Sequence, residues 1–348
     1  MIVQHLGIRM GRNYFIDAAK GLSIILVVAN HSYLSHWFEE WIISLSMIRM
    51  PLFFFLSGIF FKFSDTPFKF FGKKFSALMK PYLVFGLFLA VILPFIGRGD
   101  FVTHATGVVW GTRSEFLSLI VLWFLPHLFA VYCLAYLVLK NIKLDSSSPL
   151  HYGVLAAVYV AGLFMLESID YNAIGDVRNL GLPFSIDVAF ISLPLFLLGH
   201  MLRERVISFK PSAPIFGFSL GVFAIASLMG GFLDLHYRVL SEPFFVFLGS
   251  LFGIYTMLYC VFYVAKVPVI EKILVIVGKQ SLFILMFHAL ILGFAREPLK
   301  AINNDVAGVG LTLVSICIAV IASVFAGYVI RRIMPLRILF VPAVGLKS

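Results

Sequence analysis

The sequence predicts an all-α polytopic membrane protein with about ten transmembrane helices and both termini in the cytoplasm. Hydrophobic residues make up 61% of the chain and charged residues only 13%, and the mean hydropathy is +1.01. Soluble domains carry roughly twice that share of charge, so a soluble protein is excluded. Apolar windows long enough to cross a bilayer recur along the chain. The basic residues gather in alternate loops, which indicates the orientation.

The apolar windows come in a regular series separated by short polar loops. Each is close to the length of about 20 residues that a bilayer requires. No internal repeat, low-complexity tract or second soluble segment interrupts them, so residues 1–348 are predicted to form one transmembrane domain. The expected spans cover roughly residues 15–37, 41–61, 81–97, 115–139, 150–167, 184–202, 212–233, 243–265, 273–295 and 307–330.

The basic residues are distributed by topology. With Lys20 and Arg49 set aside, loops on one side hold nineteen Lys and Arg residues and loops on the other hold six. By the positive-inside rule, the richer side and both termini are cytoplasmic. This pattern explains the net charge of +10 without nucleic-acid binding. The cluster over residues 69–80, which includes Lys73 and Lys74, fits a topology anchor near anionic lipid best, although it would also attract a phosphate-rich ligand.

Polar residues interrupt the first two expected spans. Asp17 and Lys20 lie near the start of the first span, His31 near its end, and Arg49 within the second. A charge in the bilayer core costs roughly 2.5–3.5 kcal/mol on insertion scales, so such residues usually serve a function. Asp17 and Lys20, three residues apart, can form a local ion pair. This stretch is therefore the first candidate site.

Helix geometry brings these residues into one pattern. Lys20 and His31 are eleven residues apart, which places them within about 20° on one helix face and about 16 Å apart along the axis. In an antiparallel hairpin, His31 at about 9 Å and Arg49 at about 12 Å from the connecting turn lie at similar depth. They can face one cavity. The alternative is that both side chains merely bond to helix backbones.

Later spans carry further polar candidates. Trp123 is expected at the depth of His31. His127, one turn deeper, could belong to the same cavity or could bond the backbone carbonyl that Pro126 leaves free, and we favour the second possibility. Asp187 is expected to be interfacial. His288 is central in its span and could be functional or could be the structural partner of a functional residue.

The cysteines offer no further chemistry. Cys133, Cys260 and Cys317 all lie inside apolar runs without metal-ligand spacing, so neither a disulfide nor a metal site is expected. Two functional classes then fit a ten-span protein with buried His, Arg and Lys. One is a transporter or proton-coupled carrier, and the other is a membrane-embedded transferase whose donor and acceptor enter from opposite faces.

Five segments in order carry a resemblance to a known family. They are the stretch Arg12–Phe61, the RMPLFFFLSG run within it, LWFLPHLF, LPLFLLG and GKQSLFILMFHALIL. Together they resemble the acyltransferase-3 family of bacterial membrane-bound acyltransferases, from about Arg12 to Arg332. In this family a basic residue is followed, after ten further residues, by a histidine in the first helix, and these two positions correspond to Lys20 and His31. Its arginine, tryptophan and late histidine fall on Arg49, Trp123 and His288.

The chain departs from the family pattern in three places. Leu52 stands where a second arginine is frequent, and Leu285 stands where a tyrosine is often seen before the late histidine. Both departures concern details of substrate contact. No C-terminal esterase-like domain, which some members carry, is expected after the last span.

The resemblance implies transfer of an acyl group, most often acetyl from acetyl-CoA, to a hydroxyl of a cell-envelope carbohydrate. The acceptor could be O-antigen, capsule, exopolysaccharide or a lipid-linked sugar, and the location the bacterial inner membrane. His31 is then the expected base or acyl carrier and Arg49 the oxyanion stabiliser. Coenzyme A phosphates are expected at Lys20, with Lys73 and Lys74 nearby. The supporting residues are Asp17 to hold Lys20, Trp123 to stack on a sugar, and His288.

Overall fold

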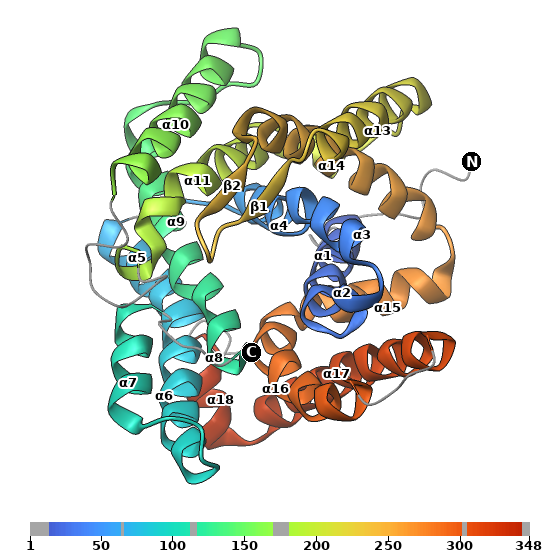
Figure 1. Cartoon of the computed structure of the whole chain (residues 1–348). Helices are drawn as coiled ribbons and strands as arrows, with labels where there is room; N and C mark the ends of the chain where they lie inside the picture. The colour runs from blue at the N-terminus through green and yellow to red at the C-terminus, as the bar shows by residue number, and fades with distance from the viewer. Residues whose placement is uncertain (1–13, 64–65, 112–116, 170–180, 301–304, 343–348) are drawn as a thin grey trace. The chain divides into compact units, whose positions relative to one another are not determined.

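The computed structural model describes residues 14–63, 66–111, 117–169, 181–300 and 305–342. Within these ranges the regular structure is helical apart from one short hairpin, which confirms the all-α fold (Figure 1). Long apolar helices dominate because intrahelical hydrogen bonds satisfy the backbone groups that lipid cannot.

The chain clusters into two compact units, each assembled from three stretches of sequence. Unit 1 comprises Met1–Phe60, Leu198–Leu235 and Val239–Val324. Unit 2 comprises Phe61–Leu197, His236–Arg238 and Phe325–Ser348. Both units are discontinuous in sequence, so neither corresponds to a simple N-terminal or C-terminal half.

Seven helical stretches in the described residues are long and apolar enough to cross a membrane. An eighth results if two helices joined at an 85° bend, Pro268–Lys279 and Ser281–Arg296, count as one span. Two expected spans are among neither these seven helices nor the bent pair. The first expected span corresponds to helix α1 (Tyr14–His31), which carries Asp17 and Lys20, and the seventh expected span corresponds to the shorter apolar helix α13 (Ala213–Leu228).

Unit 1 is built around α1. Helices α4, α14, α15 and α16 all pack against it (Figure 1). The elements of this unit are α1, α2 (Leu34–Trp37), α3 (Glu39–Ser44), α4 (Ser46–Ile59), α12 (Arg203–Ile207), α13, β1 (Phe232–Asp234), β2 (Val239–Ser241), α14 (Pro243–Val264), α15 (Pro268–Lys279), α16 (Ser281–Lys300) and most of α17 (Asp305–Arg332).

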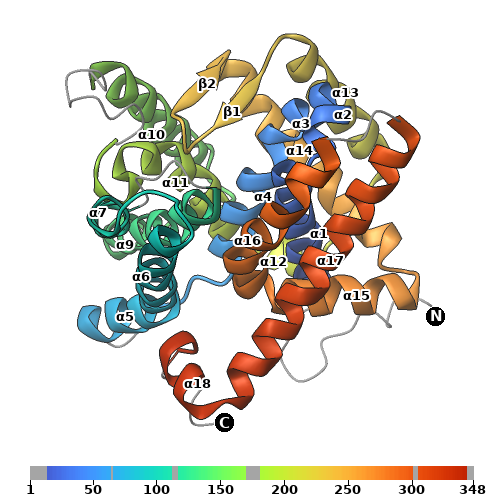
Figure 2. The ribbon, with the colours of Figure 1, turned by 60° about the horizontal axis from the view of Figure 1, so that its bottom comes forward.

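Two glycines allow α1 and α15 to cross closely. A Cβ added to Gly21 would overlap the carbonyl oxygen of Leu274, and one added to Gly278 would overlap the carbonyl oxygen of Asp17. Small residues at such crossings let helix backbones approach, which is how membrane helices gain packing contacts. Figure 2 shows α15 turning away from α16 at the bend while both stay beside α1. The bend and the close crossing therefore fix α16 against α1.

The β-hairpin is anchored on the second helix of the candidate site. In its antiparallel register Phe232 lies opposite Ser241 and Asp234 opposite Val239. The backbone N–H of Leu233 donates to the Ser46 side-chain oxygen at 3.1 Å, which attaches β1 to the start of α4. The hairpin thereby places Asp234 near this helix.

Unit 2 holds the remaining helices around an aromatic core. Phe61 lies 5.4 Å from Phe70 between ring centroids, and Tyr132 lies 4.9 Å from Phe196. The elements are α5 (Pro67–Lys74), the π-helical turn η1 (Phe75–Met79), α6 (Lys80–Phe95), α7 (Phe101–Trp110), α8 (Leu117–Ile120), η2 (Val121–Trp123), α9 (Phe124–Asn141), α10 (Pro149–Ser168), η3 (Pro183–Ser185), most of α11 (Ile186–Met201) and α18 (Met334–Phe340).

Candidate active site

A pair of histidines lies at the contact between α1 and α16. Nδ1 of His31, the last residue of α1, is 3.0 Å from Nε2 of His288, and the ring centroids are 5.2 Å apart. His288 is fully buried, whereas His31 is partly exposed. His288 thus contacts the residue predicted to be the base, and the roles of both histidines stay predictions.

The hydrogen bonds of His288 determine which nitrogens carry protons. Nδ1 of His288 is 2.7 Å from the backbone carbonyl of Ile284, and a carbonyl can only accept, so Nδ1 carries the proton. A full charge on this buried ring would be costly, so His288 is neutral and its Nε2 is an acceptor. His31 then donates from Nδ1. When His31 is neutral, this arrangement leaves its Nε2 without a proton, so Nε2 is then the basic nitrogen of the pair.

Arg49 occupies a buried position in the middle of α4. Its Nη1 donates to the carbonyl of Ile42 at 2.8 Å, and its own carbonyl accepts a hydrogen bond from the Ser23 hydroxyl of α1 at 2.9 Å. Asp234 of β1 is the carboxylate whose charge acts on it. The Arg49 side chain thus makes the kind of contact that the alternative prediction described, a hydrogen bond to a helix backbone. Its role as oxyanion stabiliser stays a prediction.

Lys20 and Asp17 lie on the same helix as His31. The Lys20 ammonium is 3.9 Å from the ring centroid of Phe60, at the end of α4, an arrangement typical of a cation–π contact. Asp17 is buried at the crossing of α1 with α15. Lys20 is thus held about 16 Å along α1 from His31. The predicted Asp17–Lys20 ion pair and the coenzyme A contact stay predictions.

The other predicted site residues belong to unit 2. Trp123 is buried in η2, with its ring 5.1 Å from that of His127 and 5.7 Å from that of His236. Lys73 is exposed on α5, while the Lys74 ammonium lies 3.6 Å from the ring centroid of Tyr132. Stacking of Trp123 on a sugar and phosphate binding at the two lysines stay predictions.

Unit 2 also contains a buried polar network that sequence reasoning missed. Asp187 is fully buried in the protein, and its carboxylate is 2.9 Å from Nε of Arg238 in the hairpin turn. Its expected depth at the membrane interface stays a prediction. His127 contacts the carbonyl of Ser185 at 3.0 Å and the hydroxyl of Ser192 at 2.9 Å. The expected bond to the carbonyl that Pro126 leaves free stays a prediction. In the sequence Arg238 is a basic residue in a predicted loop, and no local pattern links it to Asp187, 51 positions earlier.

Comparison with known proteins gives one clear result. A family model described as an acyltransferase domain, the third acyltransferase family, matches residues 13–332 of the chain. The match includes the histidine pair, Arg49, Lys20 and Trp123. Neither a curated protein nor a solved structure gives a significant match to the chain.

Proposed function

The chain belongs to the acyltransferase-3 family, and on this premise we propose that it transfers an acyl group from acyl-CoA to a hydroxyl of a cell-envelope carbohydrate. Acetyl-CoA is the proposed donor. The observation that carries the proposal is the hydrogen-bonded pair His31 and His288, because its tautomer leaves a basic nitrogen on His31. Neutral imidazole is the side chain best suited to take a proton near neutral pH.

In the proposed reaction, Nε2 of His31 takes the proton from the acceptor hydroxyl. The acceptor oxygen attacks the thioester carbonyl carbon and forms a tetrahedral intermediate. The carbon–sulfur bond then breaks, and the coenzyme A thiolate takes the proton from His31. His288 keeps the imidazole of His31 in the required orientation. Its Nε2 accepts a hydrogen bond from the Nδ1–H of His31 throughout the reaction. The partner of His31 is thus proposed to be an imidazole rather than the carboxylate found in many catalytic triads.

Positive charge has two proposed roles. Arg49 would stabilise the oxyanion, which requires its guanidinium to exchange the Ile42 carbonyl for the substrate. Lys20 would hold a phosphate of acyl-CoA about 16 Å along α1 from His31, with the pantetheine arm spanning the interval. Lys73 and Lys74 are proposed as further phosphate contacts, and Trp123 as a contact to the acceptor sugar.

The test is acyl-CoA consumption by the purified full chain with a carbohydrate acceptor. We expect His31→Ala to lower kcat about 10²–10⁴-fold, the usual contribution of general base catalysis. Lys20→Ala should raise the KM for acyl-CoA and leave the KM for the acceptor unchanged. His151→Ala is the matched control, since that histidine lies in the first turn of α10, where its Nδ1 accepts a hydrogen bond from the backbone N–H of Asp145. Turnover by His31→Ala at the rate of the wild type would refute the role of the base.

A second assay separates the proposal from the transporter alternative. Proteoliposomes holding the protein but no acyl donor should not accumulate the carbohydrate precursor, whereas accumulation without a donor would support a carrier. Loss of an acetyl mass from envelope polysaccharide in cells lacking the gene would identify the acceptor.

A further inference from the structure

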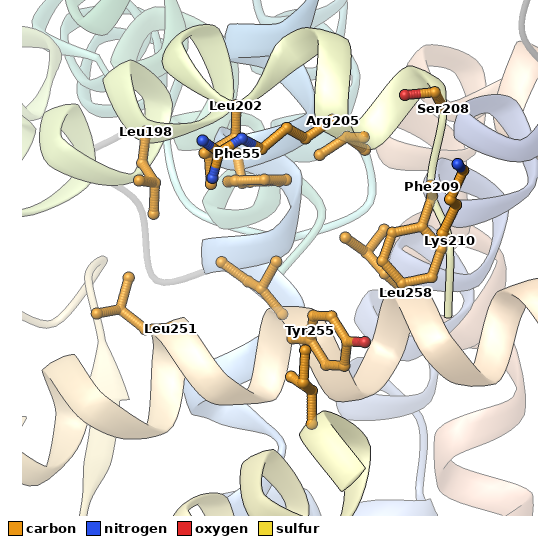
Figure 3. A pocket seen from close by; sticks show the side chains of 13 residues that line it. Phe55, Leu198, Leu202, Arg205, Ser208, Phe209, Lys210, Leu251, Tyr255 and Leu258 are labelled. Carbon is orange, nitrogen blue, oxygen red and sulfur yellow. The ribbon is translucent and has the colours of Figure 1, made fainter. Parts of the chain in front are cut away.

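Unit 1 contains a pocket that the proposed reaction does not use. It has a volume of about 600 Å³. This volume falls within the range of about 300–1,000 Å³ that is typical of ligand sites. Its walls come from α4, the end of α11, α12, α13 and α14 (Figure 3). The pocket is therefore assembled from five elements of one compact unit.

The pocket combines apolar walls with a cationic rim. Figure 3 shows Phe55, Leu251 and Leu258 around the space, with Arg205 at its top and Lys210 at its right. Within the described residues, neither cation makes a hydrogen bond or an ion pair. The neighbouring acidic residue, Glu204, lies 3.7 Å from Arg203 instead. The rim thus carries two positive charges that the surrounding protein does not neutralise.

The rim lies in the connection between two apolar helices, α11 and α13. The span Pro183–Met201 ends four residues before Arg205, and helix α13 begins three residues after Lys210, at Ala213. Basic residues at such a boundary sit at the level of lipid headgroups, where basic pockets between membrane helices bind anionic lipid. The apolar walls then lie at the level of acyl chains.

From these observations we propose that the pocket binds one acyl chain of an anionic phospholipid, with the lipid phosphate held by Arg205 and Lys210. A free phosphate would leave the apolar walls exposed to water. A zwitterionic lipid presents no net charge to the two cations. The phosphate and acyl chain of an anionic phospholipid match both features of the site. This proposal is independent of the acyl-transfer proposal, since it assigns neither donor nor acceptor.

The experiment measures lipid binding to the purified full chain by native mass spectrometry, with thermal unfolding as a second readout. Phosphatidylglycerol and phosphatidylcholine with identical acyl chains are the two probes. We expect phosphatidylglycerol to bind more tightly and to raise the Tm more. The double variant Arg205→Gln, Lys210→Gln should weaken binding of phosphatidylglycerol roughly 10- to 30-fold, since each cation near a headgroup contributes about fivefold.

The control variant is Lys140→Gln, Lys143→Gln, which removes the same charge from two exposed positions outside the pocket, at the end of α9 and just after it. It should leave the preference for phosphatidylglycerol intact. Leu251→Trp, which fills the pocket, should weaken binding of both lipids. Equal binding of the two lipids by the wild type would overturn the proposal. So would equal losses in the two double variants, or displacement of the lipid by acetyl-CoA or by inorganic phosphate.

Discussion

At the scale of single residues, the histidine pair separates what the sequence predicts, the two candidate residues, from what it does not predict, their contact. Both His31 and His288 were identified from the sequence, because ionisable residues inside apolar spans are rare and usually functional. Their contact was not predictable, since 257 residues separate them and no local pattern specifies which helices touch. The structure adds the tautomer, which follows from the Ile284 carbonyl.

Substitution of His288 tests this arrangement. We expect His288→Ala to lower kcat about 10- to 100-fold with little change in the KM for acyl-CoA, because His31 would lose the acceptor that orients its ring. His288→Gln should recover part of that loss, since an amide oxygen can accept the same proton. Initial rates at saturating acyl-CoA measure both effects. Equal activities for the alanine and glutamine variants would indicate that His288 only fills space.

The hairpin turn of unit 2 holds a different kind of histidine. His236 is 8% exposed, its ring packs on Trp123, and its carbonyl accepts a hydrogen bond from Arg238. Burial, together with the nearby positive charge of Arg238, lowers the pKa of His236 from 6.5 to about 4. In the unfolded chain the imidazole keeps its ordinary pKa and binds a proton below pH 6.5.

Stability should therefore fall as the pH drops from about 6.5 to about 4, because unfolding takes up a proton in that interval. The loss should reach up to about 3 kcal/mol for this group. His236→Phe keeps an aromatic ring against Trp123 but cannot be protonated, so its unfolding midpoint in detergent should change less between pH 7 and pH 4. Parallel pH curves for the variant and the wild type would contradict this account.

At the scale of elements, close helix crossings depend on glycines whose role emerges only in three dimensions. Hydropathy placed α1 and α15 in the membrane region, yet it gave no reason to single out Gly21 or Gly278. The structure shows that each faces a backbone carbonyl of the other helix. Every other residue has a Cβ atom, which at these positions would overlap the backbone of the neighbouring helix.

Adding a single methyl group tests the crossing. We expect Gly278→Ala to destabilise the protein by about 1–3 kcal/mol, the usual cost of overpacking, because the backbones must separate. Gly310→Ala is the matched control, since no atom lies within 4 Å of the added Cβ. That control should be neutral or slightly stabilising, as alanine favours helix more than glycine does. Midpoints of thermal unfolding in one detergent compare the two variants.

The ninth expected span shows a second limit of hydropathy. A window over residues 273–295 predicted one crossing, but the helices separate at Gln280 and bend by 85°. The polar stretch from Gly278 to Ser281 marks the break in the sequence. Hydropathy averages over about 20 residues, so such a short polar interruption hardly changes its value. Once α16 begins at Ser281, His288 lies about 10 Å along it, as the sequence geometry had allowed.

At the scale of the whole molecule, orientation rests on the distribution of charge. The excess of basic residues on one side predicts both termini in the cytoplasm. This would place Arg98 outside and Lys143 inside. The same assignment puts Lys20 on the side from which acyl-CoA arrives, so the proposed chemistry depends on it.

Cysteine labelling tests the orientation. In a variant with Cys133, Cys260 and Cys317 replaced by alanine, Arg98→Cys should react with a membrane-impermeant maleimide in intact spheroplasts. Lys143→Cys should react only after the membrane is opened. Both positions are exposed in the structure, so burial would not mask them. The reverse pattern would invert the topology and remove Lys20 from the donor side.

The pairing of two neutral imidazoles has an electrical consequence. A neutral histidine supported by a carboxylate forms a pair with one negative charge, whereas two neutral imidazoles in contact, as proposed for His31 and His288, carry none. A voltage across the bilayer exerts force only on net charge, about 2.3 kcal/mol per elementary charge for a full 100 mV drop. The resting pair therefore does not respond to the voltage. In the proposed reaction the proton that His31 takes leaves an equal negative charge on the acceptor oxygen, so the site gains no net charge and the rate should depend little on the membrane voltage.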